Sequence, residues 1–189
     1  RGSIMSITIL PAVEPTEMQR FIVAKSNQFI LHSRYDLSLM EQRILACMIS
    51  MVDSRGSDLQ DCELDIDTFC TLCKIEKRGS ARYLKEVTKG LRDQSFWMET
   101  EEGVYETFSW VEKISINEKK GKITLRFSND MKPFLLNLQS DFTSYKLPMV
   151  LRFSSRYTNI VFDLIYSKFG QNGRKSGSLE ILVDEMKER

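Results

Sequence analysis

The order of elements between Asp36 and Phe127 constrains the fold more than any other feature of this chain. A capped apolar helix opens the segment, and a short helix around Phe69 and a basic helix over Ser80–Arg92 follow it. Aromatic and β-branched residues then alternate as they do in antiparallel strands. This order is typical of a helix-turn-helix followed by a β-hairpin. We therefore predict an α+β fold of the winged-helix type.

Local signals mark the limits of these elements. Ser38 and Glu41 have the spacing of a capping box at the start of the first helix. We expect Asp67 to cap the short helix and a strand to lie within Phe21–His32. The alternation over Phe96–Phe127 predicts three strands, of which the middle one is long.

A partial second copy of the pattern follows the first. Apolar residues at helical spacing after Arg156, a loop rich in Gly and Ser, and an alternating segment from Ser178 repeat the opening of the first module. We expect a purification-tag remnant and N-terminal arm (1–20), a first winged-helix domain (21–150), and the start of a second, truncated winged-helix domain (151–189). We therefore expect the winged-helix domain described above to be the first of two tandem winged-helix domains.

Charge is informative in its distribution and not in its total. The 189 residues contain 27 Lys and Arg against 26 Asp and Glu, a formal net charge of +1. Residues 74–92 nevertheless hold seven cations and two anions. A basic cluster within a neutral chain points to a nucleic-acid partner. The short apolar runs and the four cysteines lead us to expect a cytoplasmic protein without a membrane span.

One face of the Ser80–Arg92 helix is basic, and such a helix can lie in a major groove with its first residues near base edges. A basic hairpin tip further along would act as a wing on a neighbouring phosphate. A solvated helix face and an ordinary charged turn are the simpler interpretations, but the preceding short helix favours DNA. The expected DNA-binding residues are Lys77, Arg78, Ser80, Arg82, Tyr83, Lys85, Lys89, Arg92, Lys119, Lys120 and Lys122.

The sequence predicts no catalytic residues, no metal site and no cofactor. Cys70 and Cys73 have the C-x-x-C spacing of metal ligands, but no second pair accompanies them, and core cysteines are the simpler interpretation. His32 is the single histidine, so a metal held by paired histidines cannot be built. A phosphate loop of the G-x-x-x-x-G-K type is absent too. We expect a protein that is not an enzyme.

Three segments resemble the replication initiator (Rep) proteins of theta-replicating, iteron-carrying plasmids: Val23–Asn27, Leu37–Leu45 and Ser154–Tyr157. The resemblance implies two tandem winged-helix domains that bind repeated double-stranded DNA at the plasmid origin. It also implies recruitment of host replication proteins by monomers and repression of the initiator's own gene by homodimers. The strand with Trp110, Glu112, Ile114 and Ile116 is the candidate dimer interface, because an apolar edge strand invites pairing.

Other functions fit the same pattern. A winged-helix transcriptional repressor would share the fold, since fold alone does not fix function. A dimerisation or partner-docking domain with little DNA affinity of its own is a third hypothesis. A DNA-nicking enzyme is the least favoured hypothesis, because the sequence has one histidine and cannot supply the paired histidines that would hold its metal.

Overall fold

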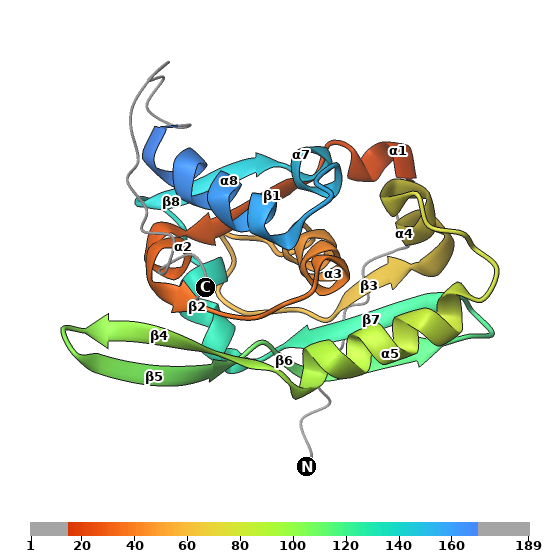
Figure 1. The fold of residues 1–189 in the computed structure, drawn as a ribbon, viewed down its shortest axis with the longest axis horizontal. Helices are drawn as coiled ribbons and strands as arrows, with labels where there is room; N and C mark the ends of the chain where they lie inside the picture. The colour runs from red at the N-terminus through yellow and green to blue at the C-terminus, as the bar shows by residue number, and fades with distance from the viewer. Residues whose placement is uncertain (1–14, 170–189) are drawn as a thin grey trace, which may run out of the picture.

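The computed structural model describes residues 15–169 (Figure 1). The chain runs through α1 (Pro15–Met18), β1 (Ile22–Ser26), α2 (Asn27–His32), β2 (Ser33–Arg34), α3 (Leu39–Ile49), β3 (Cys62–Asp65), α4 (Ile66–Cys73), α5 (Ser80–Asp93), β4 (Ser95–Glu101), β5 (Val104–Ser109), β6 (Val111–Asn117), β7 (Lys122–Phe127), η1 (Asn129–Met131), α6 (Lys132–Leu135), β8 (Phe142–Lys146), α7 (Leu147–Leu151) and α8 (Arg156–Phe169). Within these residues, none of the helices has the length and apolar character needed to cross a membrane.

The described residues form three small antiparallel sheets, and two of them contain strands of the Phe96–Phe127 segment, where the sequence predicts three strands. Their strand orders are β1–β8, β2–β4–β5 and β3–β7–β6, so the segment after α5 forms four strands in two sheets. The prediction of one long middle strand is wrong, because the chain breaks at Trp110 between β5 and β6. Trp110 is 2% exposed and turns into the core, and the β6–β7 register shifts just after it. The β4–β5 hairpin therefore projects at one end of the molecule (Figure 1), while β6 contacts α5.

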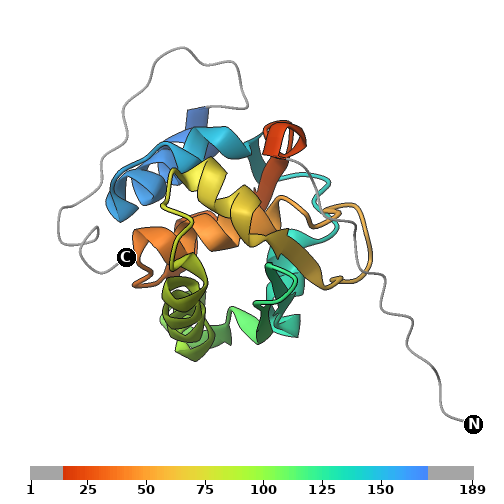
Figure 2. The same ribbon diagram turned by 90° about the vertical axis from the view of Figure 1, so that its right-hand side faces the viewer.

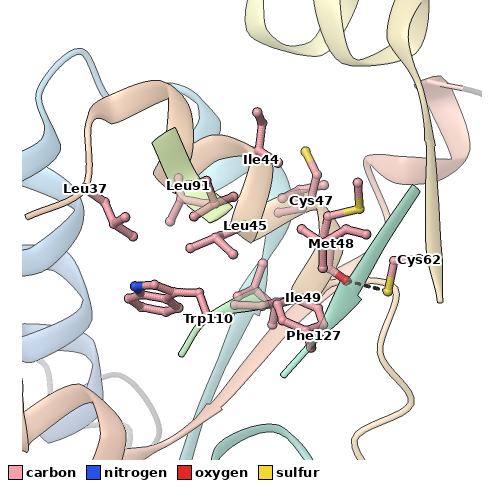
Figure 3. Close-up of a cluster of buried hydrophobic side chains, with 14 of the residues drawn as sticks. Leu37, Ile44, Leu45, Cys47, Met48, Ile49, Cys62, Leu91, Trp110 and Phe127 are labelled. Atoms are coloured by element: carbon pink, nitrogen blue, oxygen red, sulfur yellow. Dashed lines mark hydrogen bonds between the residues drawn. The ribbon is translucent and has the colours of Figure 1, made fainter. Parts of the chain in front are cut away.

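The first long helix, α3, forms the centre of the fold. Its predicted capping box is present: the Ser38 amide donates to Glu41 Oε2 at 2.7 Å, and the Glu41 amide donates to Ser38 Oγ at 3.3 Å. Apolar residues such as Ile44 and Met48 are buried around most of the helix, as Figure 3 shows. α3 contacts α5 on one side and α7 and α8 on the other (Figure 2).

One other local prediction needs correction. The cap of α4 is Asp65 and not Asp67: Asp65 has an extended backbone, and its Oδ1 accepts from the Thr68 amide at 2.8 Å. Asp67 already lies within the helix, where it cannot cap. The strand expected within Phe21–His32 is confirmed as β1, which ends where the Ser26 hydroxyl accepts from the Phe29 amide and α2 begins.

The helix after Arg156, which the sequence assigns to a second domain, packs against α2, α3 and β8. Asp163 of α8 forms a buried ion pair with Lys25 of β1 and accepts from the Tyr145 hydroxyl at 2.6 Å. The domain boundary at residue 151 stays a prediction. The loop and strand expected beyond Phe169 lie outside the described residues.

Candidate nucleic-acid interface

α5 begins where the sequence predicts, at a glycine that permits an unusual backbone. Gly79 precedes the helix with φ +78°, a left-handed conformation that favours glycine. Leu84, Thr88 and Leu91 form the buried side, and the Thr88 hydroxyl donates to the Leu84 carbonyl at 2.7 Å. The buried residues recur every three to four positions, so they lie on one side of α5 and the charged residues between them face solvent.

Five predicted DNA-binding side chains lie exposed on α5: Arg82, Tyr83, Lys85, Lys89 and Arg92. Tyr83 is 46% exposed, so its ring is accessible to a ligand. We call this surface the α5 basic face. Lys77 and Arg78 precede it and are exposed as well.

Ser80 does not belong to this surface. It is 6% exposed, and its hydroxyl donates to the Lys77 carbonyl at 2.8 Å in the turn before the helix. Its predicted approach to base edges is therefore replaced by a structural role at the start of α5.

The turn between β6 and β7 forms the predicted wing, with Lys119 and Lys120 exposed at its tip. Backbone contacts fix the turn: the Lys120 amide donates to Asn117 Oδ1 at 3.1 Å, and Gly121 has φ +62°. The Ile66 amide donates to the Gly121 carbonyl at 2.8 Å, which joins the wing to the start of α4. α5 contacts both α4 and β6, so we treat α4, α5 and this turn as one unit.

Three of the predicted cations are paired with acids of the same unit. Lys85 of α5 forms an ion pair with Glu118 of the wing. Lys122 lies 3.3 Å from Asp65, and Lys77 lies 3.5 Å from Asp67. Sequence reasoning missed the acids, because each partner comes from a different element and no periodicity links them.

Asp65 connects the wing to α4 through its ion pair with Lys122. Partial burial alone would raise the pKa of this carboxyl group, but hydrogen bonds from Thr68 and the nearby Lys122 ammonium outweigh it and lower the pKa. Asp65 is thus ionised at neutral pH and serves both as the α4 cap and as a partner of the wing.

The candidate dimer strand is β6, and its part in a dimer contact stays a prediction. β6 is an edge strand, as expected, and Glu112 is exposed on it. The Trp110 side chain is in the core (Figure 3), and Ile114 and Ile116 pair with fully buried β7 residues and pack against the core. The apolar side chains expected at a dimer contact therefore face inward.

All four cysteines are free and buried. Burial raises the pKa of Cys62 and of Cys73 from 9.0 to about 12, so both thiols stay protonated at neutral pH. Among residues 15–169, no three side chains of His, Cys, Asp or Glu gather as metal ligands would. The four thiols thus behave as small apolar core residues.

A family model described as the WH1 domain of the Initiator Replication protein (Rep3_N) matches residues 22–166. The chain belongs to this family of replication initiators. It is also 22% identical over 176 residues to a curated replication initiation protein of Escherichia coli, an alignment that covers 90% of this chain and 54% of the relative. The chain therefore spans about half the length of that relative.

Among solved structures, the crystal structure of the Pi initiator protein in complex with iteron DNA is similar to this chain. The TM-score is 0.69 with 20% sequence identity, over 90% of this chain and 72% of the Pi chain. At this identity the likeness shows the fold. The predicted winged-helix fold and the predicted replication-initiator family are both confirmed.

Proposed function

We propose that this chain belongs to a cytoplasmic plasmid initiator that binds the repeated double-stranded DNA of the origin and has no enzymatic activity. The observation that carries the proposal is the α5 basic face, exposed beside a wing that is fixed to α4. The relative found in complex with iteron DNA supports the choice of ligand.

The geometry suits a helix inserted in a groove. Arg82 and Tyr83 lie in the first turn of α5, from which a recognition helix approaches base edges. Lys89 and Arg92 lie further along and would neutralise phosphates, while Lys119 and Lys120 of the wing would contact the adjacent backbone. Phosphate contacts of this kind make the affinity fall with rising salt.

Repression of its own gene by a dimer and recruitment of host replication proteins are further parts of the proposal. For the dimer, β5 fits better than the predicted β6. β5 is also an edge strand, and Val104 and Tyr105 on it are 46% and 53% exposed. An edge strand with exposed apolar side chains favours pairing with a second copy.

Fluorescence anisotropy with a labelled duplex from the repeats beside the gene tests the proposal. The Arg82→Glu/Lys85→Glu variant should lose at least about ten-fold in affinity, because it removes the Arg82 contact and places two new negative charges on the surface that faces the DNA. The matched control Lys146→Glu/Arg152→Glu reverses two exposed cations outside α4, α5 and the wing, and should bind like the wild type. Equal losses in both variants would contradict the proposed interface.

A further inference from the structure

We infer that Glu118 is a positioning residue that withholds Lys85 from DNA phosphates and thereby lowers the affinity for any DNA sequence. The inference rests on the proposed function and adds to it an acidic residue that lowers the DNA affinity of the basic interface. It starts from the ion pair between Lys85 of the α5 basic face and Glu118 of the wing turn, which opposes DNA binding.

The ion pair joins two parts of the proposed interface. Lys85 lies in the second turn of α5, and Glu118 lies in the wing turn directly before Lys119 and Lys120. The two paired side chains are 53% and 54% exposed, so a DNA phosphate could reach the same ammonium group. A carboxylate held there competes with that phosphate.

The other two acids that pair with predicted cations differ from Glu118 in their surroundings. Asp65 is a helix cap, and its side chain is 28% exposed, so its structural role is clear. Asp67 lies 3.5 Å from Lys77, and the side chains of Lys77 and Asp67 are 57% and 69% exposed. Among the interactions of residues 15–169, the Glu118 carboxylate contacts Lys85 and caps no helix. We therefore attribute the effect of Glu118 on DNA binding to its negative charge.

The consequence for binding follows from electrostatics. If Lys85 turned to a phosphate, the Glu118 carboxylate would be left unpaired beside a polyanion, and like charges repel. Lys85 therefore stays with Glu118, and the interface neutralises one phosphate fewer than its lysines and arginines suggest. Phosphate contacts carry no sequence information, so the effect is the same on every duplex.

The test is a salt series of anisotropy titrations with Glu118→Gln, which removes the charge and keeps the side-chain shape. Affinity should rise roughly three- to ten-fold on the origin duplex and on a scrambled duplex alike, and the log–log salt slope should steepen by about 0.9. Glu101→Gln, the same change on the exposed β4–β5 hairpin, should leave the slope as in the wild type. The melting temperature of Glu118→Gln without DNA serves as the folding check.

The double variant Lys85→Gln/Glu118→Gln completes the cycle. With both charges gone, the slope should return to the wild-type value. Unchanged or weaker binding by Glu118→Gln would overturn the inference even where Arg82→Glu/Lys85→Glu abolishes binding. If that charge-reversal variant binds like the wild type, the proposed function fails instead, so the two failures are distinguishable.

Discussion

Lys25 and Asp163 form a buried ion pair that joins β1 to α8. Their side chains are each 9% exposed, and the Tyr145 hydroxyl occupies the second Asp163 oxygen. Gln42 of α3 accepts from Asn159 of α8 at 2.8 Å in the same region. Residues within the segments that carry the family resemblance thus hold α8 against the core, which gives them a structural role.

Asp163→Ala should lower the free energy of unfolding by about 3–5 kcal/mol, because it leaves the Lys25 ammonium buried without a partner. The double variant Lys25→Met/Asp163→Leu should recover much of that loss, since no buried charge remains. Urea unfolding measures both. The control is Asp53→Asn, which removes an exposed pair with Arg55 and should change stability by less than about 1 kcal/mol. Similar losses for Asp163→Ala and Asp53→Asn would refute the buried-pair account.

Alkaline pH should destabilise the fold through its thiols. Because burial raises the pKa of Cys62 and Cys73 to about 12, these thiols stay protonated in the folded state while unfolded thiols ionise above pH 9.0. The unfolded state then binds fewer protons, so the free energy of unfolding falls as pH rises, by up to about 1.4 kcal/mol per pH unit for each thiol.

Urea titrations at about pH 8 and about pH 10 check this sign. Cys62→Ala should be less stable at both values and should show a smaller difference between them. A wild-type stability that is equal or higher at the alkaline pH would contradict the buried, protonated thiols.

Gly121→Ala should cost about 1–2 kcal/mol, because Gly121 has φ +62° and a β-carbon there would meet no neighbouring atom, so the cost is in the backbone alone. The variant should also weaken DNA binding, since Gly121 connects the wing to α4. Gly121→Asn is the matched control and should cost less, because asparagine tolerates this conformation. If alanine proved as stable as glycine, the fixed wing turn would be refuted.

Tyr105→Lys should shift the protein toward monomers in light scattering over a concentration series, if copies pair through the β5 edge. The lysine removes an exposed aromatic side chain and is a residue that natural edge strands use against pairing. Glu112→Lys places the same residue on the β6 edge. Loss of the dimer in Glu112→Lys alone would favour the β6 contact predicted from sequence.

Local and periodic features of the fold could be read from the sequence. The Ser38 capping box and the limits of α5 depend on residues a few positions apart, and both are confirmed. The exposure of the α5 cations could also be predicted, because the apolar Leu84 and Leu91 lie on the opposite side of the helix and are buried.

Features that depend on distant contacts could not be predicted in the same way. The apolar alternation runs through Trp110 as though one strand continued, and only packing against the core shows the break. Asp65 and Asp67 are two positions apart with the same side chain, so the backbone at each decides which one caps α4. The Lys85–Glu118 pair joins a helix to a turn that no local pattern connects.

The most direct test of DNA binding by α5 is site-specific photocrosslinking with p-benzoylphenylalanine in place of Tyr83 or Tyr105. Both tyrosines are about half exposed, at 46% and 53%, but Tyr83 is on the α5 basic face and Tyr105 is on the β4–β5 hairpin. With a labelled origin duplex, the account predicts a crosslink from position 83 that disappears on adding Lys89→Glu/Arg92→Glu. A crosslink from position 105 with none from position 83 would contradict it.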